Sequence, residues 1–133
     1  MKRDLDVMNA VKAFHTELGV TFTHVDDGVV KGEMPIDPKL FAANSFVHAG
    51  SIVTFADTIA GFSSLTHLPE GATSFTTIEL KTNFMGAARE GVLEAVSKAE
   101  HLGRSTQVWQ VEVRLKETGK KVALFTCTQL MLH

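Results

Sequence analysis

The stretch NSFVHAGSIVTFADTIAG, residues 44–61, decides the fold, because it predicts a long apolar helix from Ala49 to about Leu65. On a helical wheel, one broad face carries only apolar side chains: Ile52, Phe55, Ala56, Ile59, Ala60 and Phe62. The opposite side is small rather than charged: Thr54, Thr58, Gly61 and Ser64. No Lys, Arg or Glu occurs between Lys39 and Glu70. We therefore expect its own sheet to cover one side of this helix and a neighbouring molecule the other.

The flanking sequence predicts an antiparallel sheet packed on this helix. Residues 105–117 are the clearest strand, because Trp109, Val111 and Val113 alternate with polar side chains. The other expected strands are 20–25, 29–36, 73–85, 90–101 and 120–132. The breaks GAAREG, HLGRS and ETGKK are short enough for hairpins and predict a four-strand meander after the helix. An amphipathic helix from Leu5 to Leu18, ended by Gly19, precedes the sheet and completes an α+β class.

Composition bounds the function. The 133 residues fit one domain, 1–133, and 44% hydrophobic residues supply a core without metal or disulfide. A net charge of −2 favours neither nucleic acid nor anionic membrane as a partner. The single cysteine, Cys127, cannot form an internal disulfide, which suits the cytoplasm, and its place in an apolar strand predicts a core residue. The start lacks the apolar core of a signal peptide, and polar residues interrupt residues 40–69 too often for a membrane span.

Asp57 is the residue of this helix that most needs explaining. Aspartate is a poor helix former, and a buried charge needs a partner, yet no basic residue lies near it in sequence. One interpretation is a structural acid bonded to a hydroxyl or a backbone N–H. The other is a nucleophile or general base, for which the surrounding small residues leave room.

The helix start offers a second candidate group. His48, Ala49 and Gly50 place unpaired backbone N–H groups at the positive end of the helix dipole, where a carbonyl oxygen could bind. An ordinary helix start explains the same residues, and Asn44 and His48 either orient a ligand or cap the helix. Ala49 and Asp57 are separated by about 12 Å along the axis. If both serve one reaction, they come from different chains, so we predict an obligate homodimer with shared sites.

The element order and the pattern N-x-x-V-H-A-G-S-x-x-x-x-A-D-T resemble the hotdog-fold acyl-CoA thioesterases, most closely the PaaI-like (phenylacetic acid degradation) branch. Residues 76–91 and 103–113 are similar to the strands that follow the helix in that family, and the resemblance covers roughly 20–132. It implies an antiparallel sheet wrapped around one central helix, an acyl-CoA substrate, no cofactor and no metal. It also implies a homodimer, arranged as a dimer of dimers.

The resemblance also implies residue roles. Asp57 takes the position of the nucleophile or general base, and the Ala49 N–H, with Gly50 beside it, that of the carbonyl-polarising group. His48 and Asn44 would hold the thioester or water from the same subunit as Ala49. Thr77 matches a water-positioning hydroxyl on the subunit of Asp57, although alternation puts it on the wetter strand face with Glu79 and Lys81. The family usually has Gly-Gly after the histidine, and the Ala49 methyl narrows that site.

Recognition of CoA and of the acyl group rests on fewer residues. Arg89, Arg104 and Lys120 lie near turns where they would meet phosphates, and the resemblance favours Gly103, Arg104 and Ser105. The candidate acyl-pocket residues, equally explained as core, are Phe41, Phe46, Phe62 and Met85.

Two other functions stay open. A hotdog dehydratase or hydratase would pair a histidine with an acid in motifs that are not found here. A non-catalytic acyl-CoA binder would keep the pocket without needing Asp57. Metal spacings, a G-x-S-x-G elbow and a dinucleotide-binding glycine fingerprint are absent.

Overall fold

The long helix forms where the sequence predicts it. In the computed structural model, which describes residues 1–133, helix α3 spans Ala49–Leu65. All six side chains predicted for its apolar face are buried. The hydroxyls of Thr54, Thr58 and Ser63 donate to carbonyls four residues earlier, at 2.9, 2.6 and 2.7 Å. These bonds satisfy polar groups within the helix itself.

Ser64 corrects the predicted small side of α3, because it is fully buried rather than outward-facing. The last turn of the helix is enclosed by the chain start as well as by the sheet. The Met1 amino group donates to the Leu65 carbonyl at 2.8 Å, and Arg3 Nε donates to the Thr66 carbonyl at 3.0 Å. These two bonds cover carbonyls that a free helix end would leave to water.

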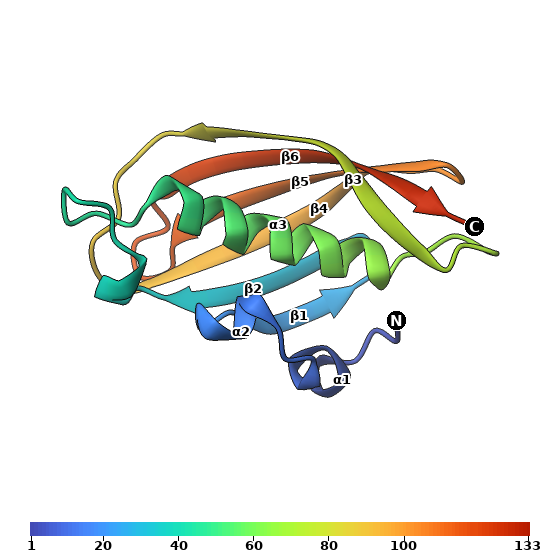
Figure 1. The fold of residues 1–133 in the computed structure, drawn as a ribbon, viewed down its shortest axis with the longest axis horizontal. Helices are drawn as coiled ribbons and strands as arrows, with labels where there is room; N and C mark the ends of the chain where they lie inside the picture. Colours follow the sequence, from blue (N-terminus) through green and yellow to red (C-terminus); the bar gives the residue numbers. More distant parts are fainter.

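Six strands form one antiparallel sheet in the order β1-β2-β4-β5-β6-β3, and α3 lies along one face of it (Figure 1). Each predicted strand is present, with ends within about two residues of those predicted. The strands are β1 Thr21–Asp26, β2 Val29–Pro35, β3 Ser74–Phe84, β4 Val92–Leu102, β5 Thr106–Leu115 and β6 Lys121–Leu132.

The predicted four-strand meander is wrong. Strand β3 pairs with β6 at the sheet edge, and β4 pairs with β2 in the interior, so GAAREG crosses over instead of turning a hairpin. The HLGRS and ETGKK segments do join hairpins, β4–β5 and β5–β6. Side-chain alternation fixes which face of a strand is dry but not which strand pairs with it.

The single N-terminal helix is also wrong, because two short helices replace it: α1 Leu5–Ala10 and α2 Phe14–Glu17. The chain turns extended at Val11. This break lets His15 enter the core beside the rings of Phe22 and Phe62, while Phe14 remains 67% exposed. A short 3₁₀ helix, η1 Pro38–Leu40, also forms in the segment predicted as a loop before α3.

The core lies between α3 and the sheet and includes Phe55, Trp109 and Phe125. One polar chain runs through it near the end of α3. Trp109 Nε1 donates to Gln107 Oε1 at 2.9 Å, and Gln107 Nε2 donates to the His67 carbonyl at 2.7 Å. This chain fixes the loop after α3 to β5. None of the helices is long and apolar enough to cross a membrane.

Candidate active site

Asp57 is half-buried in the middle of α3, and its Oδ1 is fully enclosed without any hydrogen-bond partner. Burial raises the pKa of the Asp57 carboxyl above its ordinary value of 3.8. No ion pair involves this residue. The interpretation as a structural acid required a hydroxyl or N–H donor, and Oδ1 has none. A buried carboxyl with a raised pKa and no hydrogen-bond partner is typical of a reactive site.

Cys127 locates Asp57 relative to the sheet. Burial first, and the charge of Asp57 second, raise the pKa of the Cys127 thiol to about 12. Cys127 is 2% exposed and lies on the helix-facing side of β6, in register with Leu80 of β3. Gly61 lies one turn after Asp57 on the same side of α3 and packs near Phe75 of β3, so Asp57 faces the seam between α3 and the strands β3 and β6. The thiol is a core residue, as the sequence predicts.

The start of α3 presents one unpaired backbone donor. His48 is the N-cap, and its Nδ1 accepts a hydrogen bond from the Gly50 N–H at 2.7 Å. The Ala49 N–H has no acceptor in the chain, and Ala49 is exposed. Of the two N–H groups considered from the sequence, the one on Ala49 is thus free to meet a carbonyl oxygen.

A groove of about 360 Å³ opens in front of this donor. Its walls are mainly apolar: Ala42, Asn44, Phe46, Val47, His48, Ala49, Ile52, Phe84, Gly86 and Ala87. The loop on one side is held by two bonds, from the Val47 N–H to the Ala88 carbonyl at 2.9 Å and from the His48 N–H to the Leu40 carbonyl at 2.8 Å. Asn44 Oδ1 accepts from the Phe46 N–H at 3.2 Å, while Ser45 takes a φ of 67°. Asn44 thus shapes the loop and borders the groove.

Thr77 lies on the opposite face from the one that simple alternation predicts. The register of β3 shifts between Thr77 and Glu79, so Ile78 is an extra residue. Thr77 pairs with Gln129, a core residue of β6, whereas Glu79 pairs with Thr128. The bulge places Thr77 on the helix-facing side, which is the side of Asp57.

Strand β3 is one edge of the sheet and is apolar without being covered. Ile78, Leu80 and Phe84 are 59%, 41% and 48% exposed. Open edges with apolar side chains pair with other chains unless they are protected.

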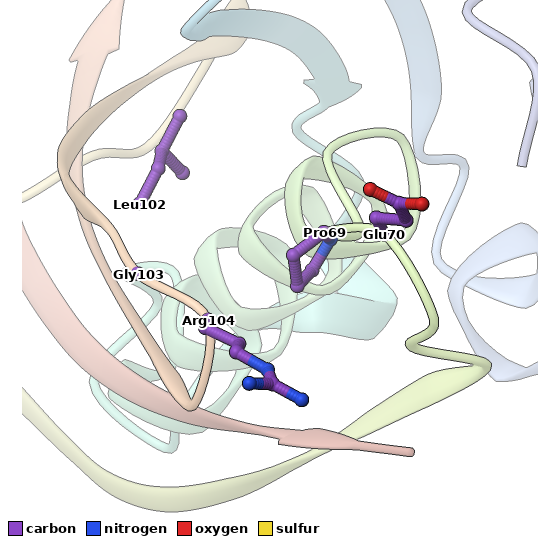
Figure 2. Close-up of a pocket in the computed structure, with 5 residues that line it drawn as sticks. All are labelled: Pro69, Glu70, Leu102, Gly103 and Arg104. Atoms are coloured by element: carbon purple, nitrogen blue, oxygen red, sulfur yellow. The ribbon is translucent and has the colours of Figure 1, made fainter.

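The predicted CoA contacts fall at two separate places. Gly103 and Arg104 line a cavity of about 610 Å³ at the end of α3 (Figure 2). Leu102, the last residue of β4, and Arg104, in the turn that follows, line this cavity on one side, and Pro69 and Glu70 of the loop after the helix line it on the other. Gly103 packs tightly there, because a Cβ would lie 3.0 Å from the Thr106 carbonyl oxygen and 2.6 Å from the movable His101 ring. Ser105 is exposed beside this cavity and accepts a backbone bond from Met131.

The remaining two predicted contacts lie near the other end of α3. The Arg89 guanidinium stands over the Phe46 ring, 5.2 Å from its centroid, and Phe46 lines the groove. Met85 follows Phe84 and is 51% exposed. Phe62, a second candidate for the acyl pocket, is instead a core residue packed on Phe22, with ring centroids 4.4 Å apart.

Within one chain, the structure therefore does not bring Asp57 and Ala49 together, since they remain about two turns apart on one helix. Two further residues with unpartnered buried polar atoms, Gln129 and Ser64, were not predicted as site residues from the sequence. A glutamine inside an apolar strand was visible in the sequence, but its missing partners appear only in three dimensions.

Comparison with known proteins finds a matching family model, a curated relative and two solved structures. A family model described as the thioesterase superfamily matches residues 44–122. The chain is 31% identical over 96 residues to 1,4-dihydroxy-2-naphthoyl-CoA hydrolase of Escherichia coli K12, covering 72% of this chain and 70% of that protein.

Two solved structures share the fold. A mutant thioesterase of Pseudomonas aeruginosa superposes with a TM-score of 0.92 at 26% identity, covering 99% of this chain and 96% of that one. The PaaI protein of the E. coli phenylacetic acid degradation operon gives 0.85 at 20%, covering 96% and 90%.

Proposed function

The chain belongs to the hotdog-fold thioesterase superfamily, and from that premise we propose that it hydrolyses an acyl-CoA to a carboxylic acid and free CoA. One observation carries the proposal: Asp57 has an enclosed, unpartnered carboxylate oxygen in a helix where the hydroxyls of Thr54, Thr58 and Ser63 bond to carbonyls of the helix itself. A binder without chemistry would gain stability by replacing this acid.

In the proposed reaction, the free Ala49 N–H binds the thioester carbonyl oxygen and stabilises the negative charge that develops on it. Asp57 then acts in one of two ways. As a general base it takes a proton from water while the water oxygen bonds to the acyl carbon. As a nucleophile it forms an anhydride that water hydrolyses. In both cases the C–S bond breaks, and the departing CoA thiolate takes up a proton.

Both groups act on one substrate only if two copies of the chain supply them. A two-fold axis would set Asp57 of one copy opposite the Ala49 N–H of its partner. The uncovered apolar edge β3 and the half-buried small side of α3 support a homodimer built on this face. A further dimer of dimers is proposed on the resemblance alone.

Arg104 and Gly103 supply the site proposed for the phosphates of CoA, with Ser105 beside it. The groove walls Phe46 and Phe84 favour an aromatic acyl group, and the related E. coli hydrolase is named for an aromatic acyl-CoA. We therefore place aryl and arylacetyl thioesters first among candidate substrates.

The test is release of CoA from a panel of aryl, arylacetyl, medium-chain and long-chain acyl-CoAs, followed with a thiol reagent. Asp57→Ala and Asp57→Asn are measured alongside. We expect the wild type to release CoA from at least one aromatic member and both variants to be severely impaired. Release from no member, or variants as active as the wild type, would remove the proposal. A stable, active monomer in size measurements would remove the shared-site mechanism.

A further inference from the structure

Two buried glutamines lie side by side in the sheet and differ in their hydrogen bonding. Gln107 on β5 and Gln129 on β6 are register partners, 1% and 0% exposed. Both ends of the Gln107 amide are occupied, by the His67 carbonyl and by Trp109 Nε1. Neither Nε2 nor Oε1 of Gln129 has a partner. Leaving such a group unpaired costs on the order of 1–3 kcal/mol. We therefore expect the Gln129 amide to bind a water or a ligand rather than another group of this chain.

The position of Gln129 connects it to the candidate site. It is the register partner of Thr77, so the two side chains share the helix-facing side of the sheet. Cys127 precedes Gln129 by two residues and therefore lies on the same face of β6. The charge of Asp57 contributes to the raised pKa of the Cys127 thiol. Gln129, which is buried, and its partner Thr77, which is exposed, thus lie on the side of the sheet that Asp57 faces, two residues along β6 from Cys127.

Other unpaired atoms lie along the same seam. Asp57 Oδ1 is buried without a partner, and so is Oγ of Ser64, seven residues further along α3 and therefore on the same side of the helix. The ring of Phe75 on β3 lies close to Gly61, where an added Cβ would be 3.3 Å from Cζ. An aromatic ring and buried polar atoms without partners thus lie along one seam, whose outer edge at Thr77 is exposed. Such enclosed polar sites in proteins are usually completed by water.

We propose that Gln129 is a positioning residue of the hydrolytic site, whose amide, together with the Thr77 hydroxyl, holds the attacking water beside Asp57. This role rests on the proposed function. An amide offers both a donor and an acceptor, so it fixes the orientation of a water as well as its position. The oriented water bonds through its oxygen to the acyl carbon and gives a proton to Asp57. That proton then passes to the CoA thiolate as the C–S bond breaks.

The matched pair Gln129→Leu and Gln107→Leu tests this role. Gln107→Leu strands Trp109 Nε1 and the His67 carbonyl, so we expect a lower Tm and unchanged kcat per folded enzyme. Gln129→Leu strands nothing in the chain, so its Tm should equal or exceed that of the wild type. Its kcat should fall about 10- to 100-fold, with KM changed less than about twofold, because a misplaced nucleophile slows chemistry rather than binding.

A third variant tests whether residue 129 lies close to Asp57. Gln129→Glu places a second carboxyl near Asp57, and a like charge raises a carboxyl pKa. The acid limb of the kcat profile should therefore move to higher pH, which a purely structural glutamine would not cause.

Three results would overturn the role of Gln129. These are a Tm loss in Gln129→Leu matching that of Gln107→Leu, a wild-type kcat in Gln129→Leu, or an unmoved acid limb in Gln129→Glu. If the wild type hydrolyses no thioester, the proposed function itself fails, and this role fails with it. If the wild type is active and only the Gln129 variants behave as structural, the inference alone is wrong.

Discussion

Replacing Asp57 by asparagine should inactivate the protein and stabilise it at the same time. The change keeps the size of the side chain and removes the charge whose buried oxygen has no partner. An unpaired buried polar group costs about 1–3 kcal/mol, and because an amide still buries polar atoms, we expect Asp57→Asn to recover about 1–2 kcal/mol at pH 7.

This gain is large enough to measure. At about 2.1 cal/mol/K per residue, 133 residues give an unfolding entropy of about 0.28 kcal/mol/K, or about 3.6 °C in Tm for each kcal/mol. Asp57→Asn should therefore melt about 4–7 °C above the wild type. Its kcat should fall at least about 100-fold, the usual contribution of a general base.

The stability gain must also depend on pH with a defined sign. Because the folded-state pKa of Asp57 lies above 3.8, the folded wild type holds its proton more tightly than the unfolded chain. The wild type then loses stability as pH rises from about 3.8 through the raised value, and the gap to Asp57→Asn opens over that interval. Asp6→Asn, at an exposed residue of α1, is the matched control and should show neither effect. A lower Tm in Asp57→Asn would show that the carboxylate has a stabilising partner and would refute the reasoning.

Three further predictions concern the surroundings of the site. Leu80→Lys should convert the proposed homodimer to an inactive monomer, because it puts a charge on the uncovered edge β3. Light scattering that shows an unchanged, active dimer would contradict this. His67 accepts the Gly28 N–H at 2.8 Å, and its pKa is lowered, chiefly by burial, so stability should be flat above about pH 6.5 and fall below it. Urea unfolding from pH 5 to 8 should show a shallower acid slope in His67→Ala, and an equal slope would exclude His67 as a cause. Cys127 should not react with a thiol reagent until the protein unfolds, because its pKa is about 12 and it is 2% exposed; rapid labelling of the native protein would contradict its burial.

The helix and the strands could be predicted from the sequence because the apolar residues of each element recur at a regular spacing along the chain. The apolar face of α3 and the alternation around Trp109 are local patterns, and the structure confirms both. The pairing of β3 with β6 is not local, since the same alternation is compatible with either edge of the sheet. The N-terminal helix failed for a related reason: its apolar spacing is helical, but burial of His15 required the chain to break at Val11.

The position of Thr77 shows how a single inserted residue controls what can be inferred about the site. Counting from Glu79 and Lys81 puts Thr77 on the outer face, whereas the bulge at Ile78 returns it to the side of Asp57. No residue type in this segment predicts the bulge. The sequence therefore predicts the spacing of the candidate acid and the helix start, which helical geometry sets, but not the orientation of the strand hydroxyl.

The same geometry explains why Asp57 can be kept at a cost in stability. Along α3, the hydroxyls of Thr54, Thr58 and Ser63 bond to the carbonyl one turn earlier, which a carboxylate cannot do because it has no hydrogen to donate. An ionised acid in this helix can be satisfied only from outside it, and neither β3 nor β6 supplies a donor to Oδ1. Substrate, water and a second copy of the chain are the remaining sources. The unpaired Oδ1 of Asp57 thus links the proposed chemistry to the proposed dimer. Its hydrogen-bond donor comes from the second copy of the chain or from the substrate and water that bind between the two copies.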